Sequence, residues 1–315
     1  MSQKKELHSK VIIIGSGPAG YTAAIYAARA MLNPLLIAGM EPGGQLTTTT
    51  DVENYPGFSN VIQGPWLMEE MKKQAEAVGT VFKNDMINKV NFKNKPFELL
   101  GESGETYIAD SIIIATGAQA RWLNLETESK FRGFGVSACA TCDGFFYKDK
   151  DVVVIGGGNA AVEEALFLTK FASKVTLVHR RDTLRAEKLL QQKILCHPKI
   201  KIIWNHQVKE VLGTDNPKGV TGILLENTKD QTTIEIKTHG MFVAIGHDPA
   251  TKIFTNQINM DKEGYILTKP DSTKTNVEGV FAAGDVKDKT FRQAVTAAGM
   301  GCMAALEAEK YLSEK

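Results

Sequence analysis

The sequence lacks the features of several specialised protein classes. Four cysteines in 315 residues are too few for the disulfide framework of a small secreted domain. Lysine and arginine number 37 and aspartate and glutamate 36, so no positive excess points to nucleic acid or an anionic membrane surface. No apolar run reaches the ~18 residues of a membrane helix. We therefore expect neither a nucleic-acid partner nor a membrane span.

The N-terminus lacks a secretion signal as well. Its polar start leads into apolar residues 11–14, which Gly15, Gly17 and Pro18 interrupt at once. A signal peptide needs a continuous apolar region of about 7–15 residues. The composition is that of a folded protein, with 43% hydrophobic and 23% charged residues, and the length allows about two domains. These observations favour a cytoplasmic enzyme.

One pattern is present twice. A β-branched run at residues 11–14, a glycine cluster and the Ala-rich residues 21–30 form the first copy; residues 152–155, a second cluster and residues 162–169 form the other. Each predicts strand, tight turn and helix, and a further apolar run follows each helix. Such a turn lets the backbone approach a pyrophosphate at a helix N-terminus, although a single copy can also serve packing alone. Two copies in βαβ context indicate a flavin dinucleotide and a nicotinamide dinucleotide.

Two later strands close these units. Residues 110–117 and 240–246 each predict a strand that runs into a turn of small residues, downstream of their own glycine cluster. The last 50 or so residues are too few for a sizeable domain and must return to the first one. We expect an α/β protein of two three-layer Rossmann-like domains, the second inserted into the first. Residues 1–118 and 249–315 would form the first domain, and residues 119–248 would form the second, which carries the Cys-x-x-Cys.

Arginines follow the second strand of the second unit. His179, Arg180 and Arg181 end that strand, Arg185 follows, and no acid occupies its end. An acid there would bind ribose hydroxyls, whereas guanidinium groups suit a 2′-phosphate, so NADPH is favoured over NADH. The alternative is a solvated basic segment that pairs with nearby acids. In the first unit Ala38 occupies the equivalent position, so Glu41 or backbone groups must serve the ribose.

The Cys139-Ala-Thr-Cys142 segment is the third chemical feature. A zinc site needs four ligands, and the remaining cysteines, Cys196 and Cys302, lie far away in the sequence. We expect no metal and take Cys302 to be a buried core thiol. Redox use is the sharper interpretation, in which one thiolate attacks a disulfide and its neighbour resolves the mixed disulfide. Asp143 would move the proton, or else form an Asx turn or a helix cap.

Together these segments resemble the low-molecular-weight, bacterial-type thioredoxin reductases over nearly the whole chain. The dithiol combined with two glycine motifs makes the resemblance specific. The segments that carry it are residues 15–20, 43–50, 53–57, 138–147, 179–181, 279–285 and 292–294.

The resemblance implies an NADPH-dependent thioredoxin-disulfide reductase that forms a homodimer, with FAD bound by residues 1–118 and 249–315 and NADPH bound by residues 119–248. Cys139 and Cys142 would be the redox pair, with Cys142 nearer the flavin and Asp143 the acid/base. FAD contacts would fall on Gly15, Gly17, Pro18, Ala19, Gly20, Glu41, Gly43, Gly44, Gln45, Asn54, Gly284, Asp285, Arg292, Gln293 and Ala294. NADPH contacts would fall on Gly156, Gly158, Asn159, His179, Arg180, Arg181 and Arg185.

The dithiol must reach the flavin and also the disulfide of a folded partner. The inserted domain has only two connections, near residues 117–121 and 246–250, so its rotation would serve both half-reactions, as the family resemblance implies.

Phe145 and Phe146 directly follow the redox pair and are candidate contacts for thioredoxin, with core packing as the alternative.

Other functions fit the sequence less well. A flavin-dependent ferredoxin reductase of this architecture would lack the dithiol, which is present here. The reductase of a peroxide-reducing system would carry an extra N-terminal dithiol domain, and this chain reaches its first strand within about ten residues. A non-enzymatic flavoprotein or a zinc-binding adaptor remains as an alternative from another class.

Overall fold

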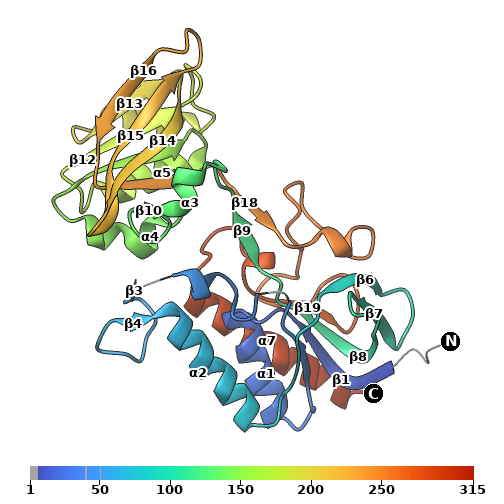
Figure 1. Cartoon of the computed structure of the whole chain (residues 1–315). Coiled ribbons are helices and arrows are strands. Elements are labelled where there is room, and N and C mark those ends of the chain that lie inside the picture. Colours follow the sequence, from blue (N-terminus) through green and yellow to red (C-terminus); the bar gives the residue numbers. More distant parts are fainter. Residues whose placement is uncertain (1–5, 40, 50) are drawn as a thin grey trace. The chain divides into compact units, whose positions relative to one another are not determined.

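The chain forms two compact units (Figure 1). The structure, a computed structural model, describes residues 6–39, 41–49 and 51–315. Unit 1 contains the chain up to Gln119 and from Asp248 onward, and unit 2 contains Ala120–His247. Unit 2 is thus inserted between the two parts of unit 1.

Unit 1 is built on a seven-stranded sheet of order β5-β2-β1-β8-β7-β6, with β19 also paired to β8. The first four of these strands and β19 are parallel, whereas β7 runs antiparallel to both β8 and β6. The strands are β1 (Glu6–Ile14), β2 (Leu35–Ile37), β5 (Val81–Lys83), β6 (Ile87–Asn91), β7 (Phe97–Gly101), β8 (Thr106–Ile114) and β19 (Val280–Ala282). A separate antiparallel pair consists of β3 (Asp51–Val52) and β4 (Ile62–Gln63).

Side chains of β1 alternate between two hydrophobic layers. Val11 and Ile13 pack with the helices, which lie together against one face of the sheet (Figure 1), whereas Ile12 and Ile14 pack with Phe254 on the other. Because both faces are covered, the strand is apolar at every position from 11 to 14. The helical elements are α1 (Pro18–Arg29), η1 (Gly44–Thr48), α2 (Gly64–Ala77), η3 (Lys252–Phe254), η4 (Gly284–Val286) and α7 (Ala294–Ser313).

Unit 2 has a five-stranded parallel sheet of order β10-β17-β11-β12-β13. Its strands are β10 (Val136–Ser137), β11 (Asp151–Gly156), β12 (Lys174–His179), β13 (Ile200–Trp204) and β17 (Gly240–Ala244). One hydrophobic cluster packs α4 (Ala140–Asp143), α5 (Asn159–Leu168) and α6 (Lys188–Leu195) against it. A second cluster includes the antiparallel sheet of β14 (His206–Asp215), β15 (Lys218–Asn227) and β16 (Thr233–Lys237). Two short helices, α3 (Glu126–Lys130) and η2 (Gly144–Tyr147), complete the unit.

The predicted fold class is confirmed. Each glycine cluster lies between a strand and a helix, and each unit is a three-layer arrangement around a sheet. The helices begin earlier than the Ala-rich patterns suggested, at Pro18 and Asn159. Proline fits the first position of α1 because its missing N–H would have no intrahelical partner there. Among the described residues, no helix combines the length and hydropathy that crossing a bilayer requires.

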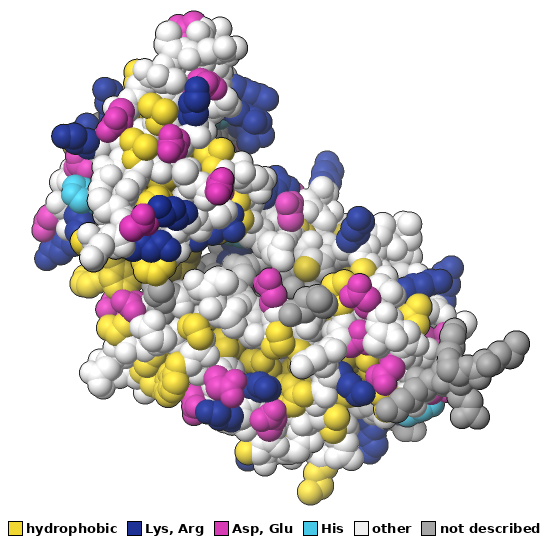
Figure 2. Space-filling view, in the orientation of Figure 1, with side chains coloured by type: hydrophobic (Ala, Val, Ile, Leu, Met, Phe, Trp, Pro, Cys, Tyr) yellow, Lys and Arg dark blue, Asp and Glu magenta, His cyan; other side chains and the backbone are white. Residues whose placement is uncertain are grey.

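Short paired strands join the units. Strand β9 (Ala118–Ala120) pairs with β18 (His247–Pro249). On the side of unit 2, the Arg121 N–H donates to the Gly246 carbonyl at 2.9 Å, and on the side of unit 1 the Ala250 N–H donates to the Gly117 carbonyl at 3.0 Å. On the face drawn in Figure 2, basic and acidic side chains are interspersed over each unit.

Candidate functional site

The first glycine turn leaves open space at the N-terminus of α1. Gly15 has φ +107° and lies so close to the neighbouring strand that a Cβ would be 2.3 Å from the Ala115 carbonyl oxygen. A Cβ at Gly17 would have nothing within 4 Å, and no side chain caps the helix there. The first N–H groups of α1 are therefore available to an anion, together with the positive end of the helix dipole. This arrangement fits a pyrophosphate.

Elements from both ends of the chain converge on this turn. A Cβ at Gly44 would lie 3.5 Å from the Gly17 Cα, which places the start of η1 beside the turn. A Cβ at Gly284 would lie 3.0 Å from the Ala19 Cβ, so η4 lies against the first residues of α1. The fold thus brings predicted FAD contacts from residues 15–20, 43–44 and 284–285 together.

Asp285 is a half-buried acid beside this turn. Burial, and secondarily repulsion from Asp288, raise the pKa of Asp285 to about 7, while Arg292 opposes the shift. Asp288 is only 7% exposed, and its carboxylate accepts the N–H groups of Phe291 at 3.0 Å and Arg292 at 3.3 Å. Asp288 thereby shapes the loop before α7, where Gln293 is the N-cap and Ala294 the first residue. Sequence reasoning missed Asp288.

Other predicted FAD contacts are less enclosed. Glu41 and Asn54 are exposed, and Glu41 contributes its carbonyl to the Gly44 N–H at 3.2 Å. The Gln45 side-chain amide donates to the Ala118 carbonyl within unit 1. The structure therefore places Gln45 next to the connection at β9, whereas Asn54 lies in the loop between β3 and β4.

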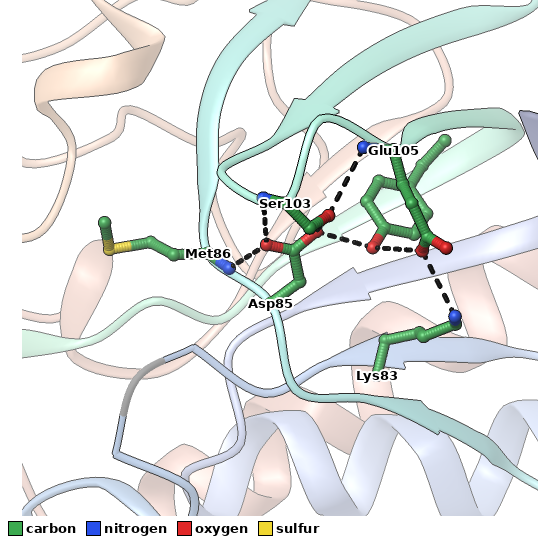
Figure 3. Close-up of polar contacts among 6 residues, drawn as sticks. Lys83, Asp85, Met86, Ser103 and Glu105 are labelled. Atoms are coloured by element: carbon green, nitrogen blue, oxygen red, sulfur yellow. Dashed lines mark hydrogen bonds and ion pairs between the residues drawn. The ribbon is translucent and has the colours of Figure 1, made fainter. Parts of the chain in front are cut away.

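A polar network around Asp85 holds the segment that follows β5, beside the end of β2 (Figure 3). The Asp85 carboxylate accepts the Met86 N–H at 2.8 Å, the Ser103 hydroxyl at 2.6 Å and the Tyr107 hydroxyl at 2.6 Å. These hydrogen bonds lower the pKa of Asp85 against the opposing effect of burial, the largest single influence. The Asp85 carbonyl accepts the Gly39 N–H at 3.1 Å. The network thus supports the strand end where a ribose would lie.

The second glycine turn also leaves free space, at the N-terminus of α5. No side chain caps α5, and a Cβ at Gly158 would meet nothing within 4 Å. The Asn159 side-chain oxygen accepts the Glu187 N–H at 2.8 Å, and the Gly157 carbonyl accepts the Arg185 N–H at 2.7 Å. These two hydrogen bonds hold the segment after β12 against the turn.

His179 differs from the arginines that follow it. Its side chain is buried, and a Cβ at Gly157 would be 2.3 Å from its ring. Burial lowers the pKa of His179; hydrogen bonds with the Thr183 and Gly156 backbone partly oppose the shift, and the charges of Arg185 and Arg180 add to it. Arg180, Arg181 and Arg185 are exposed. His179 supports the turn from behind, while the guanidinium groups remain available to an anion.

The two cysteines of unit 2 form a disulfide. Cys139 and Cys142 are joined with a Cα–Cα distance of 5.3 Å, and both are half-buried. Cys139 is the N-cap of α4, and its Sγ accepts the Cys142 N–H at 3.2 Å. The Ser137 hydroxyl, which sequence reasoning missed, accepts the Cys139 N–H at 3.0 Å. Both sulfurs are thus held at the start of one helical turn.

Asp143 completes this segment. Its side chain caps no helix, so the capping alternative is wrong; Cys139 caps α4 instead. Burial raises the pKa of Asp143, and a hydrogen bond from Ser137 partly opposes the shift. Ser137 thus contacts both Asp143 and the Cys139 backbone. A carboxyl that retains its proton above the ordinary range, beside a disulfide, can protonate a thiolate.

The remaining candidates lie at the surface or edge of their units. Phe145 is 58% exposed, with its ring centroid 6.1 Å from that of Phe171, whereas Phe146 is half-buried. Cys196 is exposed, and Cys302 is half-buried at the edge of α7 rather than buried in the core. That expectation was wrong because α7 packs only its alanine face against α1. The described residues contain no cluster of His, Cys, Asp and Glu that could hold a metal ion.

Known proteins match the chain over nearly its whole length. A family model for pyridine nucleotide-disulphide oxidoreductases matches residues 9–301. A thioredoxin reductase of Rickettsia bellii is 62% identical over 309 residues, which is 98% of this chain and 100% of that protein. A thioredoxin reductase structure from Giardia duodenalis has a TM-score of 0.93 and 43% identity, over 97% of this chain and 99% of that chain. One from Streptococcus pyogenes has a TM-score of 0.93 and 41% identity, over 98% and 99%.

Proposed function

The chain belongs to the pyridine nucleotide-disulphide oxidoreductase family and, within it, to the thioredoxin reductases, and on this basis we propose that it reduces oxidised thioredoxin with NADPH, through FAD and Cys139–Cys142. The resemblance stated from the sequence is thereby confirmed. The observation that carries the function is the disulfide on α4, in a unit with its own dinucleotide-type turn. A ferredoxin reductase would have no use for that pair.

FAD is assigned to unit 1 and NADPH to unit 2. The uncapped start of α1 would take the FAD pyrophosphate, and Asp285 would lie near the ribityl chain, as the family resemblance implies. The uncapped start of α5 would take the NADPH pyrophosphate, and Arg180, Arg181 and Arg185 its 2′-phosphate. Bound FAD would supply the two-electron chemistry that links NADPH to the disulfide, and the residues of the two units would hold the cofactors in place for it.

The reduced pair then acts on thioredoxin by thiol–disulfide exchange. A thiolate of the pair attacks one sulfur of the thioredoxin disulfide, which forms a mixed disulfide and releases the other thioredoxin sulfur as a thiolate. The second cysteine attacks its neighbour, restores Cys139–Cys142 and frees the remaining thioredoxin thiolate. The Asp143 carboxyl donates a proton to a departing thiolate, and the Cys142 N–H stabilises negative charge on the Cys139 sulfur.

The inserted unit rotates between the two half-reactions in this proposal. The two connections run through the paired strands β9 and β18, with hydrogen bonds at Gly246 in unit 2 and Gly117 in unit 1 on either side of them, so rotation would bend the chain at or beside these strands. A disulfide cross-link between the units should stop turnover while both cofactors stay bound, and reduction of the cross-link should restore it. Undiminished turnover in the cross-linked state would rule out the rotation.

Phe145 is the proposed anchor for thioredoxin. Its ring is solvent-exposed three residues after Cys142, and Phe146 provides half-buried apolar area beside it. Exposed Lys148 and Lys150 lie on the same segment. An exposed aromatic with a polar rim is typical of an interface anchor.

A homodimer and a cytoplasmic location complete the proposal. Helix α7 exposes Val295, Met303 and Leu306 along one face, and Tyr26 of α1 is exposed as well. A second copy of the chain that covers this face would bury these apolar side chains. Sedimentation of the wild type and of Leu306→Glu tests the dimer: we expect a dimer for the wild type and a monomer for the variant. Free thiols at Cys196 and Cys302 suit a reducing compartment such as the cytoplasm.

The decisive assay for this function is NADPH consumption without oxygen. Purified protein should oxidise NADPH continuously only when oxidised thioredoxin is present, and Cys142→Ser should abolish that activity. Consumption with a ferredoxin or an artificial acceptor, and never with thioredoxin, would leave a flavin reductase and contradict the proposal.

A further inference from the structure

Ser16 is a buried serine inside the first glycine turn. It is 3% exposed, and its hydroxyl donates to the Ala38 carbonyl at 2.7 Å. The same oxygen accepts the Gly43 N–H at 3.0 Å. A hydroxyl can donate one hydrogen bond and accept two, so this single group serves both contacts and also a hydrogen bond with the Tyr21 hydroxyl of α1. Ser16 therefore links the turn to two backbone segments that are distant from it in sequence.

Each of these segments borders the proposed FAD site. Residues 15–17 provide the pyrophosphate turn, and Ala38 follows the end of β2, where the ribose of a dinucleotide lies in this fold. Gly43, with φ +100°, is the N-cap of η1. A bound ADP moiety would therefore contact all three segments.

We infer that Ser16 is a positioning residue for FAD: its hydroxyl holds the pyrophosphate turn, the ribose-side strand end and the start of η1 in their binding arrangement. The inference rests on the proposed function, because it requires unit 1 to bind FAD. Ser16 is not expected to contact the reacting atoms, since its hydroxyl hydrogen-bonds with other groups of the protein.

Loss of the Ser16 hydroxyl should reduce the affinity for FAD more than it reduces the stability of the apoprotein. Without it, the Gly43 N–H and the Ala38 carbonyl lose a buried partner. In the apoprotein the loops can relax and take water instead, whereas FAD binding forces them back together. The penalty of leaving buried polar groups unpaired therefore falls on cofactor affinity, and we expect a Kd for FAD about 10-fold higher.

The test compares Ser16→Ala with Ser111→Ala. Ser111 is 0% exposed, lies in β8 of the same unit, and donates to the Gly279 carbonyl at 3.0 Å, so it loses a similar buried hydrogen bond away from the turn. Apoprotein of each variant is titrated with FAD, followed by flavin fluorescence, and with ADP as a competitor. Both variants should lower the Tm of the apoprotein, but only Ser16→Ala should raise the Kd values for FAD and ADP, by similar factors.

Equal FAD affinity for Ser16→Ala and wild type would overturn the inference, as would an equal loss in both variants. If the Ser16→Ala protein unfolds when FAD is removed, the rate of FAD release is measured on the diluted holoprotein in place of the titration. That rate should then be about 10-fold faster than in wild type and Ser111→Ala. Ser16→Thr keeps the hydroxyl and should fall between Ser16→Ala and wild type. A wild-type apoprotein that takes up no FAD would overturn the proposed function too, which separates the two failures.

Discussion

Asp143→Asn is the substitution that examines the proton chemistry most closely. Burial raises the pKa of this carboxyl above its ordinary value of 3.8, so the folded protein holds the proton more tightly than the unfolded chain does. The stability that the protonated form contributes is complete below the unfolded pKa and is lost as the pH rises through the folded pKa. Asparagine has the same shape and never ionises. At neutral pH the variant should therefore be at least as stable as wild type.

Turnover should respond in the opposite direction. A positioned general acid contributes roughly 10²- to 10⁴-fold to rate, so Asp143→Asn should slow thioredoxin reduction by at least about 10²-fold. The assay is a single turnover in which enzyme already reduced by NADPH is mixed anaerobically with oxidised thioredoxin. In wild type this rate should fall with rising pH as Asp143 loses its proton, and the asparagine variant should lack that limb.

Asp149→Asn is the matched control. Asp149 lies on the same segment but is exposed, and its φ of +58° is a conformation that asparagine also tolerates. The control should keep wild-type turnover, stability and pH profile. A wild-type rate and an unchanged pH limb in Asp143→Asn would refute the assignment of Asp143 as the proton donor.

Three further predictions concern the support, cofactor and partner sites. Asp85→Asn should lower the free energy of unfolding by about 1–3 kcal/mol at pH 7, because the hydrogen bonds to the carboxylate weaken. Since the pKa of Asp85 is lowered by folding, that difference should shrink in denaturant titrations as the pH falls through the folded pKa; a constant difference would contradict it. Arg185→Ala should raise the KM for NADPH about 10-fold and leave that for NADH unchanged in steady-state kinetics, and equal effects on both would remove the 2′-phosphate contact. Phe145→Ala should raise the KM for thioredoxin without slowing reduction by NADPH, whereas slower reduction at an unchanged KM would indicate a packing role. Lys237→Ala, exposed on β16 of unit 2, serves as its control.

The parts of the fold that follow from local pattern were predictable. Each glycine cluster and its flanking strand and helix lie within about 30 residues, the size of a βαβ unit, and Cys139 and Cys142 are three residues apart. In these cases the chemistry depends on neighbours along the chain. The insertion of unit 2 was also readable, because each closing strand follows its own glycine turn.

Contacts between distant segments were not predictable in the same way. Ser16 is an unremarkable residue within its motif, and its partners are backbone atoms whose position depends on tertiary packing. Asp288 and Ser137 differ from Ser16, because they accept backbone N–H groups only two to four residues further along the chain, in local turns that the motifs did not single out. His179 stays a predicted NADPH contact; its burial against Gly157 is an additional feature that the motif did not indicate.

The central claim is that electrons reach thioredoxin through Cys139–Cys142, and the redox state of these thiols tests it most directly. Anaerobic NADPH should make both cysteines reactive to an alkylating reagent, and a later addition of oxidised thioredoxin should return them to the protected disulfide, as read by mass spectrometry. Cys196 and Cys302, which are free thiols, provide an internal reference that does not change with either addition. Thioredoxin reduction while Cys139–Cys142 stays oxidised throughout would contradict the account.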